Sequence, residues 1–286
     1  MYTVDLHMHS YFSDGIYSPD EVLKKANEDN IEVVALTDHD TVAGIKAISD
    51  KSIVNNFING IELTCCQYDF GLNSCTPSLH ILGYGIDVDN KNLNKFLKER
   101  MKKKEDILKE FKEEMQLLHS DKSAIQIGSK NRVVPHIGDL YRYLAEDGYL
   151  PQYVKEELAR EYSLKYNKIN ILPQDAINLI KEAGGISIWA HPYITYCNGR
   201  GITLTNEEIE KVLNDLKNFG LEGIEAQYIL FNCDQKNFLS DLAEKNNFFV
   251  SAGGDFHGYK GRDSFICCEN SLIMPLLSKL LSKDHF

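Results

Sequence analysis

The chain has 286 residues, of which 43% are hydrophobic and 26% charged, and its formal net charge is −11. This composition is that of an ordinary globular protein with enough apolar residues for a core. The negative charge argues against broad electrostatic binding to duplex DNA, which depends on many lysine and arginine contacts. Because no apolar run approaches the ~18 residues of a membrane span, no membrane partner is expected.

The start of the chain and its cysteines together predict a cytoplasmic protein. Residues Tyr2–Leu6 read as a strand, and no basic segment leads into a longer apolar run, so we expect no secretory signal. The seven cysteines are scattered and form no Cys-x-x-Cys pair. Such a set is typical of reduced thiols in a cytoplasm.

Seven apolar runs with strand character follow one another along the chain. They are Val4–Leu6, Val33–Leu36, Ile58–Leu63, Leu79–Leu82, Ile186–Ala190, Gly223–Ala226 and Phe248–Ala252. Amphipathic helical stretches lie between most of them, and the first begins with the start signal Ser18-Pro19-Asp20-Glu21. Alternating strands and helices predict an α/β fold with a largely parallel sheet, and about seven such units suggest a closed or nearly closed barrel.

The alternation stops between about residues 90 and 171. Asn90–Ser120 is a long, charged helical stretch whose apolar residues recur at helical intervals, and shorter helices are expected at His136–Asp147 and Gln152–Tyr162. We interpret residues 90–171 as a helical insertion that packs as a cap over the barrel mouth. Residues 1–89 and 172–286 would then form the barrel. The alternative is that the segment is only a long connection within one domain.

Nine candidate metal ligands lie in short clusters at or near the ends of these apolar runs. They are His7, His9, Asp14, His39, Glu62, His80, His191, Asp255 and His257. Barrel enzymes carry their chemistry at the C-terminal ends of the strands, and imidazole and carboxylate are common ligands of divalent metals in hydrolases. The pattern predicts a polynuclear metal site at the barrel mouth, and such sites commonly hydrolyse phosphate esters.

Each motif alone has an ordinary explanation, and only their joint occurrence predicts the site. His7 and His9 are two residues apart in an extended segment, so both project from one face of the strand. A carboxylate at Glu62 would be buried and costly unless metal ions paired it. By itself, however, His80 could be a buried core histidine, and His191 could be an ordinary residue at a strand end.

Four segments resemble the motifs of the polymerase-and-histidinol-phosphatase (PHP) superfamily of metal-dependent phosphoesterases. They are Asp5–Ser10, Leu36–Thr41, Ala190–Pro192 and Gly254–His257, and the resemblance extends from residue 5 to residue 258. It implies a distorted (βα)7 barrel with a trinuclear site. By that likeness one ion would be held by His7, His9, Glu62 and Asp255, a second by Asp14, His39 and His257, and the third by Glu62, His80 and His191.

Within this superfamily the chain looks most like bacterial members that act on nucleotides and short RNA. The resemblance rests on Leu36–Thr41 and on the insertion that contains Pro135 and His136. Those members include nucleoside 3′,5′-bisphosphate phosphatases and a 5′-to-3′ exoribonuclease, which implies a phosphorylated small molecule or short RNA as the partner. One departure concerns Arg132, because relatives tend to have an arginine directly before the Pro-His pair and here Val133 and Val134 intervene.

The predicted reaction is hydrolysis of a phosphate ester by a metal-activated hydroxide, which requires no protein nucleophile. Asp38, Asp40 and His136 are the candidate proton donors to the leaving oxygen, and the sequence does not choose among them. Manganese is the preferred metal, with iron and zinc as alternatives for a site of nitrogen and oxygen ligands.

Arginines are the expected phosphate-binding residues, because a planar guanidinium suits phosphate oxygens. The candidates are Arg100, Arg132 and Arg200. Arg100 lies in a lysine-rich helical stretch, so a solvated position on the protein surface is the favoured interpretation for this residue. Arg200 is expected in a loop near the mouth.

Three alternative functions remain open at this point. A histidinol-phosphate phosphatase would perform the same chemistry on another substrate, but its relatives generally lack the insertion. A non-catalytic metal-binding regulatory module would retain the barrel without turnover, and the complete ligand set argues against it. An amidohydrolase also uses histidines at a barrel mouth, but no lysine stands in the matching place. The oligomeric state does not follow from the sequence.

Overall fold

A computed structural model of the chain describes residues 2–118, 135–197, 200–266 and 271–282. All seven predicted strands are present and form one curved sheet. Its order is β1 (Val4–Met8), β2 (Val33–Leu36), β3 (Asn56–Gln67), β4 (Ser78–Tyr84), β5 (Ile186–Trp189), β8 (Gly223–Tyr228) and β9 (Phe249–Gly253). The chain after β9 returns to β1, where the backbone N–H of His9 donates to the carbonyl of Phe256 at 2.8 Å. The predicted α/β fold with a nearly closed barrel is therefore confirmed.

One strand runs against the others. β4 pairs antiparallel with both β3 and β5, whereas the pairs β1–β2, β2–β3, β5–β8 and β8–β9 are parallel. The connection from β3 to β4, residues 68–77, contains no helix, and a parallel crossover needs a dozen or more residues. The predicted largely parallel sheet is thus interrupted at β4. The reversal brings the start of β4, with His80, to the mouth where the other strands end.

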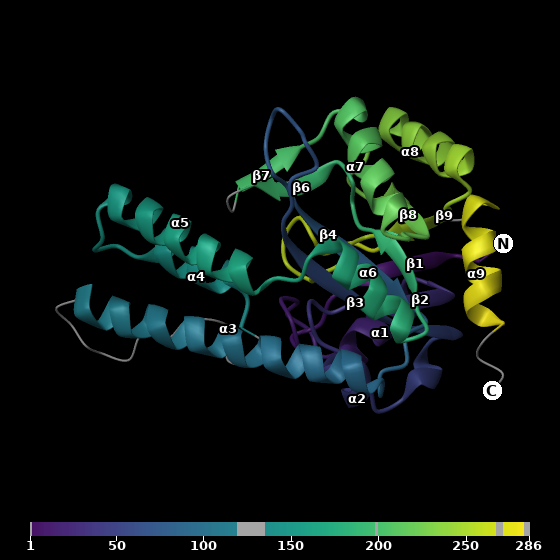
Figure 1. Ribbon diagram of the computed structural model, residues 1–286. Helices are drawn as coiled ribbons and strands as arrows, with labels where there is room; N and C mark the ends of the chain where they lie inside the picture. The colour runs from purple at the N-terminus through teal and green to yellow at the C-terminus, as the bar shows by residue number, and fades with distance from the viewer. Residues whose placement is uncertain (1, 119–134, 198–199, 267–270, 283–286) are drawn as a thin grey trace.

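Helices cover the outside of the barrel (Figure 1). They are α1 (Pro19–Glu28), α2 (Ala43–Ala47), α6 (Pro173–Glu182), α7 (Asn206–Asn218), α8 (Cys233–Asn246) and α9 (Met274–Leu281). The start signal of α1 acts as predicted, because Ser18 is the N-cap and forms a capping box with Glu21. No helix in the described ranges is long and apolar enough to cross a membrane.

Three helices between β4 and α6 project to one side of the barrel (Figure 1). They are α3 (Lys91–Leu118), α4 (Ile137–Glu146) and α5 (Gln152–Ile169), close to the predicted positions, although α5 is longer than expected. They share an apolar cluster of their own, in which Phe111, Leu140 and Tyr162 are fully buried. Because this cluster is separate from the barrel core, we propose that residues 90–171 form the helical insertion.

Candidate metal centre

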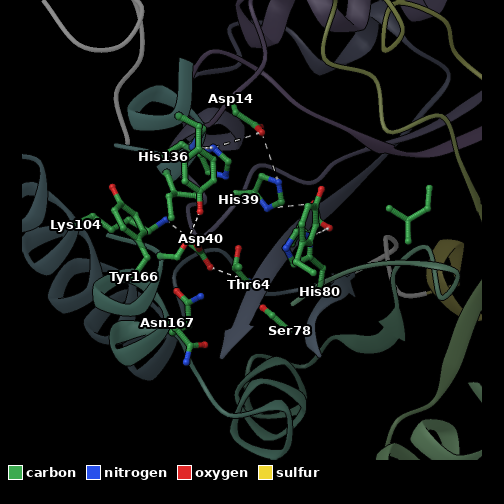
Figure 2. A pocket seen from close by; sticks show the side chains of 18 of the residues that line it. Asp14, His39, Asp40, Thr64, Ser78, His80, Lys104, His136, Tyr166 and Asn167 are labelled. Carbon is green, nitrogen blue, oxygen red and sulfur yellow. Dashed lines mark hydrogen bonds and ion pairs between the residues drawn. The ribbon is translucent and has the colours of Figure 1, made fainter. Parts of the chain in front are cut away.

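All nine predicted ligand side chains converge at one mouth of the barrel. Eight of the nine residues are buried, and the side chain of Asp14 is 13% exposed. The mouth opens into a cavity of about 320 Å³, in which Asp14, His39 and His80 face one another (Figure 2). Side chains far apart in the sequence therefore meet because the strands, and the loops that follow them, bring them to the same edge of the sheet.

Glu62 in β3 is the centre of this cluster. Its Oε2 lies 3.0 Å from Nε2 of His7, 3.1 Å from Nε2 of His9 and 3.3 Å from Nδ1 of His39. Its Oε1 lies 2.8 Å from Nδ1 of His80 and 3.2 Å from Nε2 of His191. Burial alone would raise the pKa of Glu62, but the surrounding imidazoles hold it well below its usual range. The carboxylate is therefore ionised, and each of its oxygens faces several nitrogen donors.

Three groups of side chains each bring their ligand atoms within 4.8 Å of one another. The first is His7, His9, Glu62 and Asp255, the second is His9, Asp14, His39 and His257, and the third is His39, Glu62 and His80. The first group has the same members as the set implied by the family resemblance. The second adds His9, and the third has His39 where the resemblance implies His191.

The chemistry of these donors fits divalent cations better than hydrogen bonds among themselves. Nε2 of His9 and Nδ1 of His39 are buried and have no hydrogen-bond partner among the described residues, although each lies within 3.3 Å of Glu62. Buried polar atoms are rarely left without a partner. A cation between nitrogen and carboxylate would satisfy both, and this set of nitrogen and oxygen atoms suits such ions.

Glu225 in β8 is a partner of the cluster that the sequence analysis missed. It is fully buried, and its Oε1 lies 2.9 Å from Nδ1 of His7. Its Oε2 accepts a hydrogen bond from the backbone N–H of His191 at 2.8 Å. A carboxylate on the second ring nitrogen of a ligating histidine fixes the orientation and tautomer of the ring. An acidic residue inside the apolar run Gly223–Ala226 was the signal that could have identified it.

Asp255 is oriented by two other residues outside the predicted set. Its Oδ2 accepts hydrogen bonds from Tyr228, at 2.8 Å, and from the guanidinium of Arg262. Its Oδ1 points to the histidines, 3.2 Å from Nε2 of His9 and 3.4 Å from Nδ1 of His257. One oxygen of Asp255 is thus held by the protein while the other faces the cluster.

Asp38 does not line the cavity, in contrast to its predicted role as a proton donor. Its Oδ1 accepts hydrogen bonds at 2.7 Å from the backbone N–H of Ser10 and from Oγ of Ser13, and its Oδ2 accepts one at 2.7 Å from Oγ of Ser10. These bonds hold the turn that carries His9 and Asp14. The structure therefore speaks against proton transfer by Asp38 and indicates a supporting role.

We expect Asp38→Asn to weaken metal binding by about 10–100-fold, as loss of a supporting partner of a metal site typically does. Asparagine keeps the size of the side chain but cannot accept all three hydrogen bonds, so the turn with Asp14 would loosen. Titration of the metal-stripped protein with Mn²⁺ measures the affinity. The shape of the pH–rate profile at saturating metal should remain unchanged, and loss of one limb would show that Asp38 transfers a proton after all.

Asp40, another predicted proton donor, forms ion pairs with two residues of α3. Its Oδ1 lies 2.8 Å from NH1 of Arg100, and its Oδ2 lies 2.8 Å from Nζ of Lys104 (Figure 2 shows the lysine contact). Its Oδ1 also accepts a hydrogen bond from the backbone N–H of Thr64 at 3.1 Å. Burial alone would raise the pKa of Asp40, but the two cations hold it below the usual range. An aspartate that stays ionised cannot supply a proton at neutral pH.

His136 is the remaining candidate for proton transfer. It is the N-cap of α4, and its Nδ1 accepts a hydrogen bond from the backbone N–H of Gly138 at 3.1 Å. The proton of the neutral ring therefore lies on Nε2. The ring stacks on His39 with centroids 5.3 Å apart and lines the cavity (Figure 2). This position beside the ligand cluster suits a proton donor.

The structure places the three predicted phosphate-binding arginines differently. Arg100 lines the cavity and is only 2% exposed, so the favoured reading of a solvated surface residue is wrong. Arg200 is exposed in strand β7 (Arg200–Thr203), part of a hairpin with β6 (Ile194–Cys197), and does not line the cavity. Arg132 lies outside the described residues. Lys104 and Arg262, which the sequence analysis did not select, also line the cavity.

Comparison with known proteins places these features in a family context. Residues 5–172, more than half of the chain, match the PHP domain family. The chain is 29% identical over 274 residues to a 5′-3′ exoribonuclease of Haemophilus influenzae, and the match covers 88% of this chain and 89% of that protein. It is 27% identical over 289 residues to a 3′,5′-nucleoside bisphosphate phosphatase of Chromobacterium violaceum, and this match covers 92% of this chain and 90% of the phosphatase.

The fold also matches a solved structure over almost its whole length. A Chromobacterium violaceum protein, named an amidohydrolase and solved with bound sulfate and no metal, superposes with a TM-score of 0.72. The match covers 98% of this chain and 96% of that chain at 24% sequence identity. At this identity the likeness shows the shared fold alone.

Proposed function

Since this chain belongs to the PHP domain family of metal-dependent phosphoesterases, we propose that it hydrolyses phosphate esters of nucleotides or of short RNA ends. The observation that carries the proposal is the arrangement of the cavity. The ligand cluster forms one part of its wall, and two buried cations, Arg100 and Lys104, form another. A cavity that offers both suits a substrate with two phosphate groups.

We propose that the cluster holds three divalent ions and that manganese is the preferred metal. Glu62 would be shared between ions, because its two oxygens face five histidines. The bound ions would polarise the phosphoryl oxygens and lower the pKa of water towards ~7, which supplies a nucleophile at neutral pH. Among the protein groups, Glu225 and Tyr228 would keep His7 and Asp255 in their orientations.

Arg100 and Lys104 would bind the second phosphate. They lie one turn apart on α3 and share a single ionised partner, Asp40, so two positive charges and one negative charge leave a net charge of about +1. An excess positive charge in a buried site attracts a phosphate, which here would be the second group of a nucleoside bisphosphate or the next phosphodiester of an RNA end. Arg132 stays a predicted contact, and the exposed position of Arg200 gives it no support.

His136 would supply the proton to the leaving oxygen. Its Nδ1 accepts a hydrogen bond from the N–H of Gly138, so Nε2 would carry the proton that is donated to the leaving oxygen, and Nδ1 would take up a proton from water to complete the transfer. The alternative, a histidinol-phosphate phosphatase, has a substrate with one phosphate and would leave the excess positive charge of Arg100 and Lys104, which Asp40 balances only in part, without a phosphate to bind. The two cations therefore favour the nucleotide substrates.

The proposal is tested by phosphate release from adenosine 3′,5′-bisphosphate, AMP, histidinol phosphate and a 5′-phosphorylated RNA oligomer, with RNA shortening followed in parallel. We expect the Mn²⁺-loaded protein to act on the bisphosphate or the RNA, and the chelator-stripped protein to lose activity at least 100-fold and regain it when Mn²⁺ is added. Turnover of histidinol phosphate alone would replace this proposal by the alternative. A protein that binds metal but acts on none of the four would contradict it.

A further inference from the structure

Two exposed tyrosines line the cavity beside the ligand cluster. Tyr196 in β6 is 37% exposed, and Tyr259 in the segment after β9 is 39% exposed. The ring of Tyr196 is stacked on His80, with centroids 5.7 Å apart and an interplanar angle of 29°. The ring of Tyr259 lies 5.2 Å from that of His257 at 54°. Each tyrosine thus contacts a candidate ligand with part of its ring and keeps the rest open to the cavity.

Both tyrosines face the same cavity, where they lie beside the candidate ligands His80 and His257. The two rings therefore offer aromatic faces near the proposed position of the reacting phosphate.

Two other parts of the cavity wall already have proposed occupants. The reacting phosphate belongs at the ligand cluster and the second phosphate at Arg100 and Lys104 on α3. The hairpin that carries Tyr196 lies away from α3. In Figure 1, β6 and β7 are in the upper part of the view, and α3 runs along the lower left part of the view. In a nucleoside 3′,5′-bisphosphate the ribose carries two phosphates, a base and a 2′-hydroxyl. The base is the group that would point to the side of the tyrosines.

We propose that Tyr196 and Tyr259 form a stacking platform for the base of the nucleotide that carries the reacting phosphate. This inference rests on the proposed function and specifies which part of the substrate is recognised. Stacking on an aromatic ring is open to every base, because each base has a π-face. The platform therefore makes the enzyme select nucleotides over phosphate esters that lack a base, with little preference among bases.

Two substrates that differ only in the base test this inference. They are adenosine 3′,5′-bisphosphate and 1-deoxyribose 3,5-bisphosphate, compared by kcat/KM with the Mn²⁺-loaded protein. The ratio of the two values, nucleotide over base-free, should exceed one for the wild type and fall by about tenfold in Tyr196→Ala or Tyr259→Ala, as expected for loss of one stacked base. Tyr196→Phe and Tyr259→Phe keep the ring and should keep the ratio.

Tyr149→Ala is the matched control, because Tyr149 is 86% exposed and does not line the cavity. An unchanged ratio in both alanine variants would overturn the platform, and so would an equal fall in the phenylalanine variants, which would assign the effect to the hydroxyls. If the wild type hydrolyses both substrates equally well, the proposed function stands and this inference fails alone. If it hydrolyses neither, this inference fails, and the proposed function then depends on the result with the RNA oligomer.

Discussion

Replacement of Glu62 by glutamine is expected to reduce the rate of phosphate release by more than about 100-fold. Loss of a residue that only supports a metal ligand typically reduces activity by roughly 10–100-fold, and Glu62 is itself a proposed ligand. Glutamine has nearly the same shape, so the change mainly removes the negative charge. That charge faces His7, His9, His39, His80 and His191 at 2.8–3.3 Å and is the only carboxylate in the described cluster that approaches all five. Metal content per chain should fall as well, because a neutral amide is a poor bridge between cations. Elemental analysis of the purified protein, together with kcat, measures both effects.

Glu222→Gln is the control for this substitution. Glu222 directly precedes β8, at the end of the strand opposite to the mouth, and its carboxylate is paired with Lys279 at 2.9 Å. The control should retain wild-type metal content and activity. If Glu62→Gln binds as much metal as the wild type and remains as active, then Glu62 does not hold the ions, and the proposed centre would have to be rebuilt around Asp14 and Asp255.

The barrel and the ligand cluster could be predicted because both depend on a pattern that repeats along the chain. Each apolar run is long enough for one strand, and a histidine or carboxylate stands at or near its end. The direction of β4 could not be predicted in the same way, because an apolar strand reads alike in both directions. His80 nevertheless reached the mouth, since it stands near the start of a reversed strand.

The supporting residues were harder to predict because their partners lie far away in the sequence. Lys104 pairs with Asp40 across 64 positions, and a lysine in a charged helix ordinarily faces water. Asp38 and Asp40 flank the same histidine but have different partners. Asp40 has a positive φ of 55° and pairs with α3, whereas Asp38 is buried and accepts hydrogen bonds from the turn at Ser10. Sequence spacing alone does not contain that difference.

We expect Asp40→Asn to lower the free energy of unfolding by about 3–5 kcal/mol, because it removes the ion-pair partner of two buried cations. Arg100 and Lys104 are 2% and 3% exposed, and both form an ion pair with this carboxylate. For a chain of this size the midpoint of thermal unfolding should fall by roughly 10 °C. Thermal and urea unfolding measure the change. Asp89→Asn is the control, because Asp89 forms an ion pair with Lys46 with its own side chain 82% exposed, and such pairs contribute about 1 kcal/mol or less.

Two further measurements separate this ion-pair effect from a general loss of packing. Adding Lys104→Met to Asp40→Asn removes one of the unpaired charges and should restore part of the lost stability. Burial raises the pKa of Asp40, but its cationic neighbours lower this pKa below the usual value. The contribution of Asp40 to stability is therefore complete at every pH above about 3.9, the pKa of an aspartate in the unfolded chain. The contribution is then lost as the pH falls through the lower pKa of the folded state. The difference in stability between the wild type and Asp40→Asn should therefore stay constant from about pH 7 to pH 5 and shrink below about pH 4. A difference that does not depend on pH over this whole range would show that Asp40 acts through its shape and hydrogen bond to Thr64, and not through its charge.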